Sequence, residues 1–154
     1  MTVVSGQPAP DFTLPADSGG SVSLAALRGR PVVLYFYPKD DTSGCTKEAC
    51  AFRDQFPAFS ALDAVVIGVS KDGPKSHDKF KTKYALPFTL ACDEDTALAQ
   101  AYGVWVEKSL YGRKYMGMDR ATFLIDRTGV VRAVWRKVKV AGHAEAVLKA
   151  VREI

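Results

Sequence analysis

The pattern of apolar and polar positions predicts strands that alternate with helices along most of the chain. Uninterrupted apolar and aromatic runs at 32–37 and 64–69 are typical of strands that are buried on both faces. Between them, from Gly44 to about Phe59, apolar residues recur every three or four positions, which predicts a helix. A second helix is expected from Lys75 to Tyr84, followed by a short strand from Phe88 to Ala91.

The last third of the chain predicts a hairpin and a final helix. Strands are expected at Ala121–Ile125 and Val130–Trp135, because the tight-turn sequence Asp-Arg-Thr-Gly joins them. A short helix that runs through Tyr102 is expected before them, with Asp95 and Thr96 as its cap. The final helix is expected to bury four apolar residues, Val147, Leu148, Val151 and Ile154.

The order of these elements indicates an α/β fold. Strands that alternate with helices and end in a hairpin predict a sheet that is partly parallel and has an antiparallel edge. The order β–α–β–α–β–β–α is that of a thioredoxin-like fold, with a central mixed β-sheet flanked by helices. Residues 12–27 are expected to add an N-terminal β-hairpin extension and a short helical turn. With 154 residues, we expect a single domain, 1–154, that buries a substantial core.

Composition and charge narrow the possible partners. Hydrophobic residues make up 47% of the chain and charged residues 25%, as in an ordinary globular protein. The net charge of +4 is scattered, and we interpret the densest basic cluster, Arg136–Lys139, as a solvated strand end rather than a nucleic-acid surface. No apolar run is long enough to cross a bilayer. We therefore expect neither a nucleic-acid partner nor a membrane association.

The cysteine count and the first residues indicate the compartment. Three cysteines, an odd number, argue against a secreted disulfide framework and favour a reducing compartment. The first ten residues lack the basic and apolar regions of a secretory signal. A cytoplasmic protein is expected. In such a compartment a cysteine pair is more often catalytic, metal-binding or redox-sensing than structural.

Cys45 stands where a polar loop turns into a helix. The residues 38–44 before it are mostly polar or turn-forming, so we expect Cys45 in the loop-to-helix corner and off the apolar stripe of the helix. The free N–H groups of a helix start stabilise negative charge, and a cysteine there tends towards the nucleophilic thiolate. The alternative is a small buried hydrophobic residue without a chemical role.

The helix start alone does not supply enough energy to ionise this thiol. A free thiol with a pKa near 8.5 is only about 3% ionised at pH 7, and lowering its pKa to about 6 takes about 3.4 kcal/mol. A helix N-terminus typically supplies about 0.3–1 kcal/mol. A cation from a neighbouring strand or loop is therefore required. Arg120 is the candidate, because it directly precedes the predicted strand 121–125 and is always charged.

For Arg120 and Thr42, a role without chemistry remains an alternative. Arg120 is otherwise a surface charge in a loop. Thr42 lies three residues before Cys45, where its hydroxyl either caps the helix or hydrogen-bonds to a ligand oxygen.

Cys50, five residues after Cys45, is the candidate resolving cysteine. In a regular α-helix the Cα atoms of residues five apart are about 8.6 Å from each other, whereas disulfides rarely span more than about 6.8 Å. A bond between the two cysteines therefore requires the helix to unwind locally. The alternative is that Cys50 is a cysteine of the helix core.

Other kinds of site are disfavoured. A zinc site is not expected, because no C-x-x-C occurs and His77 and His143 lie far from the cysteines without ligand spacing. Phosphate-loop, dinucleotide and hydrolase motifs are also missing. Cys92 has no motif around it and is interpreted as incidental. We expect neither a metal nor an organic cofactor.

These residues closely resemble the peroxiredoxins, and among them the Q-type branch, also called bacterioferritin comigratory protein. The resemblance covers most of the chain, in the segments Gly6–Phe12, Tyr35–Cys50, Gly68–Ser70, Asp93–Asp95, Tyr102–Trp105, Arg120 and Thr122–Asp126. One departure is Ser43, where the family usually has proline. Serine is expected to be more flexible there, but the change removes no catalytic group.

The resemblance implies the roles of the site residues. Cys45 is implied as the peroxidatic cysteine, and Cys50 as the resolving cysteine of the subclass that forms its disulfide within one chain. Pro38, Thr42 and Arg120 are implied to complete the peroxide pocket, with Pro38 shielding the sulfur from solvent.

The resemblance also implies the reaction and its partners. Such an enzyme reduces hydrogen peroxide and organic hydroperoxides through a sulfenic acid, forms an intramolecular disulfide and is recycled by thioredoxin or a similar dithiol. Because resolution needs no second subunit, a monomer is expected. Two alternatives remain: a peroxide sensor or redox relay that passes its disulfide to a partner protein, and a protein-disulfide oxidoreductase, which the missing C-x-x-C disfavours.

Overall fold

The computed structural model describes residues 3–154, so Met1 and Thr2 of the N-terminal segment lie outside the described residues. At the centre is a five-stranded sheet in the order β5-β4-β3-β8-β9. β3, β4 and β5 run parallel, whereas β8 is antiparallel to β3 and β9 to β8. The strands span Val32–Phe36 (β3), Val65–Ser70 (β4), Thr89–Cys92 (β5), Ala121–Ile125 (β8) and Val131–Trp135 (β9). The predicted mixed sheet with an antiparallel edge is confirmed.

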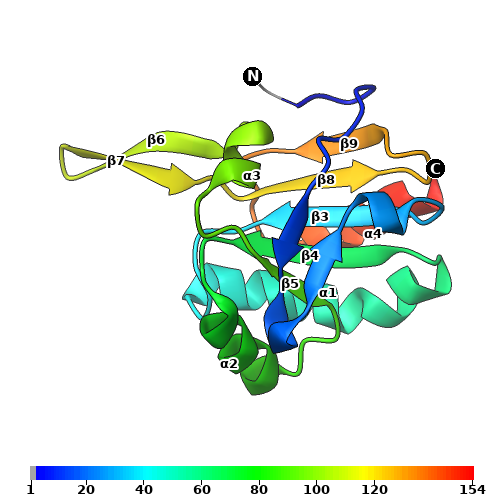
Figure 1. The fold of residues 1–154 in the computed structure, drawn as a ribbon, viewed down its shortest axis with the longest axis horizontal. Coiled ribbons are helices and arrows are strands. Elements are labelled where there is room, and N and C mark those ends of the chain that lie inside the picture. The colour runs from blue at the N-terminus through cyan, green and yellow to red at the C-terminus, as the bar shows by residue number, and fades with distance from the viewer. Residues whose placement is uncertain (1–2) are drawn as a thin grey trace.

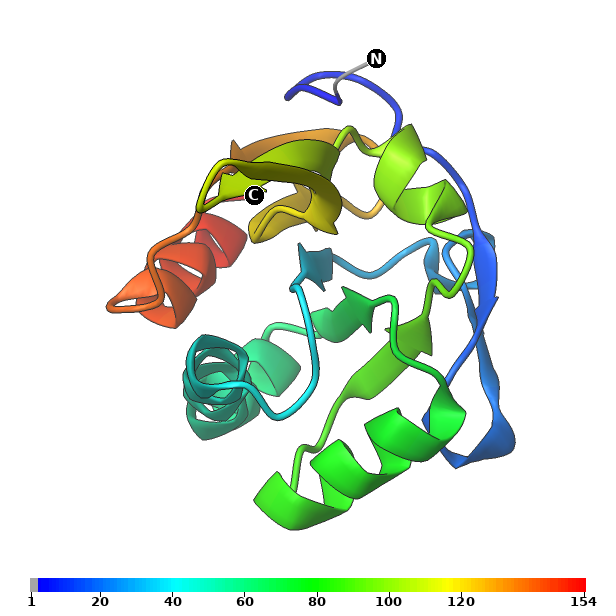
Figure 2. The same ribbon diagram turned by 90° about the vertical axis from the view of Figure 1, so that its left-hand side faces the viewer.

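Helices flank this sheet on both faces (Figure 1). They span Ser43–Ala61 (α1), Pro74–Tyr84 (α2), Ala97–Ala101 (α3) and His143–Arg152 (α4). Figure 2 shows α1 and α4 on one side of the sheet and α3 with the N-terminal segment on the other, while α2 lies near the edge strand β5. In the described part of the chain, no helix is both long and apolar enough to span a membrane.

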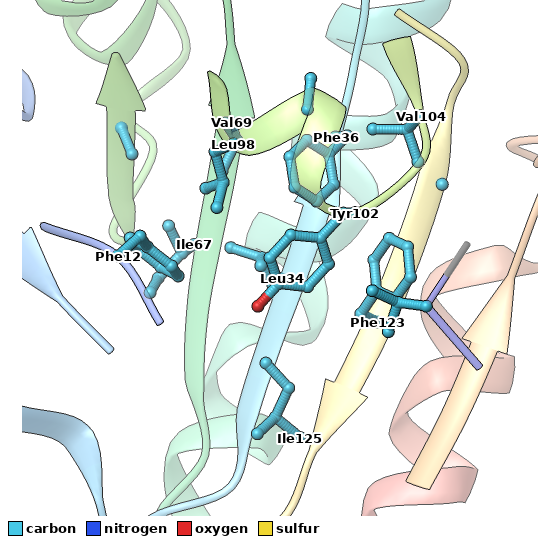
Figure 3. Packing of buried hydrophobic residues seen from close by; sticks show 14 of the residues in the cluster. Phe12, Leu34, Phe36, Ile67, Val69, Leu98, Tyr102, Val104, Phe123 and Ile125 are labelled. Carbon is cyan, nitrogen blue, oxygen red and sulfur yellow. The ribbon is translucent and has the colours of Figure 1, made fainter. Parts of the chain in front are cut away.

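The core consists of two layers of buried side chains that meet at β3. Alternate residues of this fully buried strand point to opposite faces of the sheet. Leu34 and Phe36 pack with Tyr102 and Phe123 on the α3 side (Figure 3). Tyr35 points to the other side, where its ring stacks on Phe52 of α1 at 4.7 Å. Packing on both faces therefore fixes β3, and the active-site loop departs from its end.

The N-terminal extension is the expected hairpin. β1 (Thr13–Pro15) pairs antiparallel with β2 (Ser21–Ser23). Short 3₁₀ turns follow the two strands at Asp17–Gly19 (η1) and Ala25–Leu27 (η2).

α3 is shorter than expected and is capped differently. The buried carboxylate of Asp93 accepts hydrogen bonds from two N–H groups of the helix, at 2.8 and 3.0 Å. Asp95 accepts one more, at 3.0 Å. Thr96 takes a left-handed backbone conformation and its hydroxyl caps no N–H group of the helix. The predicted cap is therefore confirmed for the Asp95 side chain, whereas Thr96 occupies the N-cap position without a side-chain cap hydrogen bond.

Two residues near element ends also differ from expectation. Cys92 is the last residue of β5 and does not follow the strand. Ile154 lies beyond the end of α4 and is exposed, so it does not belong to the apolar face of that helix. The other three residues of the predicted face, Val147, Leu148 and Val151, are buried.

A second hairpin, which the sequence pattern did not lead us to expect, connects α3 to β8. β6 (Trp105–Leu110) pairs antiparallel with β7 (Arg113–Met118), and Figure 1 shows both strands projecting beyond the end of the central sheet. The turn residues Tyr111 and Gly112 have positive φ angles of 51° and 76°, as a type I′ turn requires. Most side chains of this hairpin are not buried. The segment therefore lacks the apolar pattern by which a strand is recognised.

Candidate active site

Cys45 lies in the first turn of α1, directly after the loop that leaves β3. The helix begins at Ser43 with Thr42 as its N-cap residue, so the cysteine is in the turn whose N–H groups lack partners within the helix, as predicted. Its burial differs from the prediction. Cys45 is only 2% exposed and belongs to one buried cluster with Ala49 and Phe52. Spacings of four and three residues place them on one helix face, so Cys45 lies on the apolar stripe.

Arg120 contacts this sulfur from the residue directly before strand β8, as predicted. It precedes β8, whose first residue, Ala121, pairs with Phe36 at the end of β3. The arginine therefore lies at the end of the sheet from which the loop to α1 departs. Its Nη2 is 3.3 Å from Sγ of Cys45. A Cβ at Gly44 would lie 3.1 Å from the same nitrogen, so the missing side chain there lets the guanidinium approach.

A third ionisable side chain, Glu48, contacts Arg120, and the sequence analysis missed it. Its Oε1 accepts a hydrogen bond from Nη1 of Arg120 at 2.7 Å, and its side chain is only 1% exposed. Its Oε2 has no hydrogen-bond partner among the described residues. Burial raises the pKa of Glu48 to about 7, although Arg120 acts in the opposite direction. The signal in the sequence was the spacing, because a residue three positions after Cys45 lies on the same helix face.

The site therefore places one permanent cation between two groups that ionise. Burial acts to lower the pKa of Arg120, but Glu48 and Cys45 together outweigh it and the pKa is raised. The guanidinium stays charged and directs separate N–H groups at the carboxylate and at the sulfur. Such a fork suits a thiolate, and it also suits negative charge that develops on an oxygen bound beside the sulfur.

Thr42 and Pro38 belong to the loop between β3 and α1. The hydroxyl of Thr42 donates to the carbonyl oxygen of Lys39 at 2.8 Å and caps no N–H group of the helix. Of the two alternatives for this hydroxyl, capping of α1 is therefore not observed, although Thr42 occupies the N-cap position. Both residues are exposed, and their contact with a ligand stays a prediction.

A hydrogen-bond network fixes this loop to α2. The carboxylate of the buried Asp40 accepts from the hydroxyls of Tyr37 and Ser76, at 2.5 and 2.8 Å, and lies 2.7 Å from Nδ1 of His77. Nε2 of the same ring lies 2.8 Å from the carbonyl oxygen of Ala91. Burial acts to lower the pKa of His77, but Asp40 outweighs it and the pKa is raised. The buried ring thereby ties the loop to both α2 and β5.

The same network contains a group of possible metal ligands. Asp40, Asp72 and His77 bring ligand-type atoms within 4.8 Å of one another. These atoms already have partners, since Asp72 accepts from the backbone N–H of Asp40 at 2.8 Å and from the hydroxyl of Ser70 at 2.6 Å. A metal ion would have to displace these donors. We therefore interpret the group as an anchor of the loop.

Cys50 and Cys92 differ in their surroundings. All three cysteines are free thiols. Cys50 is half-buried and lies in the same continuous helix as Cys45, so the separation predicted for a regular helix applies to this pair. Burial and neighbouring acidic groups raise the pKa of Cys92 to about 11, which makes it a poor nucleophile at neutral pH.

His143 lies closer to the site than its position in the sequence suggests. Its Nε2 is 2.7 Å from the hydroxyl oxygen of Thr122, two residues after Arg120, and its ring packs edge-on against Phe52 of α1. Burial and the charge of Arg120 lower the pKa of His143 to about 4. The ring is therefore neutral at physiological pH and packs between Thr122 and Phe52.

Comparison with known proteins identifies the family. The AhpC/TSA family model matches residues 5–134. The putative peroxiredoxin bcp of Coxiella burnetii is 55% identical over 148 residues, which cover 96% of this chain and 98% of that protein. Peroxiredoxin Bcp of Bacillus subtilis is 49% identical over 154 residues, covering 100% and 98%.

A solved structure agrees with this result. The bacterioferritin comigratory protein of Xanthomonas campestris, determined in work on its alkyl peroxide reduction activity, superposes with a TM-score of 0.92 at 42% identity. The match covers 97% of this chain and 98% of that one. As the sequence resemblance predicted, the chain belongs to the AhpC/TSA family and, within it, to the peroxiredoxins of the Bcp, or Q, branch.

Proposed function

We propose that this peroxiredoxin reduces hydrogen peroxide and organic hydroperoxides with Cys45 as its nucleophile, as part of antioxidant defence. One observation carries the proposal: Nη2 of Arg120 lies 3.3 Å from Sγ of Cys45, in the first turn of α1. Membership of the peroxiredoxins supports the reaction class. The alkyl peroxide reduction described for the X. campestris relative supports the substrate class.

The chemistry of the first step follows from this arrangement. The Cys45 thiolate attacks the terminal oxygen of the hydroperoxide, an S–O bond forms and the O–O bond breaks. The electron pair of the broken O–O bond leaves with the other oxygen of the peroxide. This oxygen takes up a proton to become an alcohol or water, and Cys45 is left as a sulfenic acid. Arg120 stabilises the charge that moves onto the leaving oxygen. We propose that Thr42 and Pro38, from the loop before Cys45, border the space in which the peroxide lies. The step needs no metal or organic cofactor.

The second step would form a disulfide within the chain. The Cys50 thiol attacks the sulfenic sulfur of Cys45 and water leaves. Because a regular helix holds the two Cα atoms about 8.6 Å apart, the start of α1 must unwind first. Asp40 is bound to Ser76 and His77 of α2, and His77 is bound in turn to Ala91 of β5, so we expect the unwinding to be confined to the segment 43–50.

A dithiol protein such as thioredoxin would complete the cycle. Its two thiols are oxidised to a disulfide while Cys45 and Cys50 each regain a proton and an electron. The odd number of cysteines favours a reducing compartment, and we propose that this cycle takes place in the cytoplasm. Since both cysteines belong to one chain, we propose that the monomer is the catalytic unit.

A coupled assay tests the proposal. The reduced protein is mixed with hydrogen peroxide or cumene hydroperoxide, thioredoxin, thioredoxin reductase and NADPH, and NADPH oxidation is followed. Steady turnover is expected for the wild type. A single stoichiometric oxidation without turnover would favour the alternative of a sensor or relay that passes its disulfide to a partner protein.

Cysteine variants assign the roles. Cys45→Ser is expected to abolish peroxide consumption. Cys50→Ser is expected to keep the first oxidation, lose thioredoxin-linked turnover and over-oxidise. Cys92→Ser is the matched control and is expected to behave as wild type. A Cys45–Cys92 bond in the mass spectrum of the oxidised protein would show that Cys50 is not the resolving cysteine.

A further inference from the structure

The hairpin β6–β7 has no part in the chemistry proposed above, although it begins beside the active site. β7 ends at Met118, only two residues before Arg120. At the base of the hairpin, the N–H of Asp119 donates to the carbonyl oxygen of Val104 at 2.8 Å. In Figure 2, the hairpin and the loop from β3 to α1 lie on the same side of the molecule. Strands of this length extend about 20 Å from their base, far enough to contact a protein docked over Cys45.

Exposed apolar side chains are concentrated on this hairpin. The large hydrophobic residues exposed in the described part of the chain are Val4, Leu110, Tyr111, Tyr115, Met116 and Ile154. Four of these six belong to the hairpin, and Tyr111 at its tip is 96% exposed. Scattered single exposures are normal on a protein surface, whereas such a grouping is typical of an interaction site.

The two faces of the hairpin differ in charge. The strand register puts Leu110 opposite Arg113 and Lys108 opposite Tyr115, so these four residues share one face, which we call the docking face. It carries two basic side chains and no acidic one. The ammonium of Lys108 is bound to the carbonyl oxygen of Met118 at 2.7 Å and lies 3.9 Å from the carboxylate of Asp119, so its charge is partly balanced. Arg113 has no ion-pair partner among residues 3–154, so its charge is available to a partner.

The opposite face offers a matched comparison. It carries the basic Lys114, which follows Arg113 in the sequence, and the apolar Met116, which follows Tyr115. Lys114 is 3.6 Å from Glu107, so the basic charge of this face is balanced by an acidic one. Met116 is 50% exposed and Tyr115 is 48% exposed, so the two faces offer apolar side chains of similar exposure.

We propose that the docking face, with Tyr111 at the tip, binds the protein dithiol that reduces the Cys45–Cys50 disulfide, and that this partner presents an acidic, partly apolar surface around its reactive thiol. The inference rests on the recycling step of the proposed function. In that step the partner's thiolate attacks one sulfur of the disulfide, the other sulfur leaves as a thiol, and the partner's second thiol then releases the first. The attacking thiol must reach the end of the sheet where the hairpin begins.

Charge and apolar contact identify this partner chemistry. An acidic surface would be attracted by the unpaired Arg113 during encounter, and apolar residues around its thiol would cover Leu110 and Tyr115. A nucleic acid would meet few phosphate-binding cations on this face, because Lys108 is already bound to the backbone. A second copy of the chain would meet the same unbalanced positive charge on both sides, which disfavours that pairing.

Paired variants of the intact protein test the inference. Arg113→Glu and Tyr115→Ser change the docking face, while Lys114→Glu and Met116→Ser make the same kinds of change on the opposite face. Turnover is measured with thioredoxin, thioredoxin reductase and NADPH, and separately with dithiothreitol as the reductant. The two docking-face variants are expected to raise the KM for thioredoxin by about fivefold or more. The two control variants are expected to stay near wild type, and dithiothreitol-supported turnover is expected to be unchanged in all four.

Each other outcome overturns the inference. Equal effects of Arg113→Glu and Lys114→Glu would mean that overall charge steers the reductant without a specific face. Unchanged KM values in all variants would show that thioredoxin binds elsewhere. If the wild type turns over with dithiothreitol but not with thioredoxin, the proposed recycling fails as well. Sedimentation that shows a dimer dissociated by Tyr115→Ser would assign the face to a second copy, and tight binding of a single-stranded oligonucleotide lost in Arg113→Glu would assign it to nucleic acid.

Discussion

The buried carboxylate of Glu48 should make the stability of this protein depend on pH in an unusual direction. Burial raises the pKa of Glu48 from 4.5 to about 7 in the folded state, even with Arg120 2.7 Å away. Between these two values the folded protein binds the proton and the unfolded chain releases it. Stability from this group is therefore complete below pH 4.5 and falls as the pH rises towards 7, whereas a salt-bridged carboxylate usually shows the reverse.

The size of the effect follows from the shift. At about 1.36 kcal/mol per pKa unit, a rise from 4.5 to about 7 corresponds to about 3 kcal/mol lost across this pH range. Such a loss is a large fraction of the stability of an average domain. Glu48→Gln cannot ionise but can still accept the hydrogen bond from Arg120 through its amide oxygen. The free energy of unfolding of the variant should therefore lack this pH dependence.

Urea unfolding of the wild type and of Glu48→Gln at pH 4.5 to 8 measures the difference. Both proteins carry Cys45→Ser, so that Glu48 is the group next to Arg120 that differs between them. The wild type is expected to lose about 3 kcal/mol relative to the variant between pH 4.5 and pH 8. An altered hydrogen bond between the amide and Arg120 sets a constant offset between the two proteins, whereas ionisation of Glu48 sets the slope. A difference in unfolding free energy that does not change with pH would refute the reasoning.

The remaining predictions concern the arginine, the helix start and the loop anchor. Arg120→Lys is expected to slow the first oxidation by about 100-fold in stopped-flow measurements, because an ammonium cannot hold both Glu48 and Cys45 as the guanidinium fork does; a rate within threefold of wild type would contradict this. Gly44→Ala should stabilise α1 by about 0.5–1 kcal/mol yet slow the oxidation by about tenfold, because the new Cβ would lie 3.1 Å from Nη2 of Arg120; a stabilised variant with an unchanged rate would contradict the contact. Asp40→Asn is expected to cost about 3 kcal/mol in chemical denaturation. Asp40 raises the pKa of His77 in the folded protein, so the wild type is expected to lose stability as the pH rises above 6.5. This loss should be absent from Asp40→Asn. The same pH dependence in wild type and variant would contradict the role of this pair.

Sequence reasoning found the parts of the site that follow from local rules. A buried strand that runs into a polar loop and a helix places Cys45 at the helix start, whatever packs around it. Arg120 was within reach because β8 pairs antiparallel with β3, which brings the residue before β8 to the end of β3. Both inferences needed only the order and direction of the strands.

One missed feature depends on packing between distant segments, and two depend on local geometry that the polar pattern concealed. Glu48 looks like an ordinary polar residue of a helix until Arg120, 72 residues away in the chain, is placed against it. Cys45 was expected off the apolar stripe because polar residues precede it, but the helix face that it shares with Ala49 and Phe52 decides its burial. The Asp93 cap of α3 was missed because the carboxylate bonds five and six residues ahead, beyond the usual capping distance. Tertiary structure determines the contact between Glu48 and Arg120, whereas the helix face of Cys45 and the Asp93 cap are local features that the pattern of polar residues concealed.

The first turn of α1 is stabilised by tertiary contacts rather than by capping residues of its own. It has no side-chain cap, since the hydroxyl of Thr42 bonds to Lys39, and no acidic residue in its first turn. What holds this turn folded is the burial of Cys45 and the contact between its sulfur and Arg120. Oxidation to a neutral sulfenic acid would weaken that contact while Asp40 keeps the preceding loop on α2. We therefore expect the oxidation itself to loosen the turn that keeps Cys50 away from Cys45, so that resolution follows oxidation without a separate trigger.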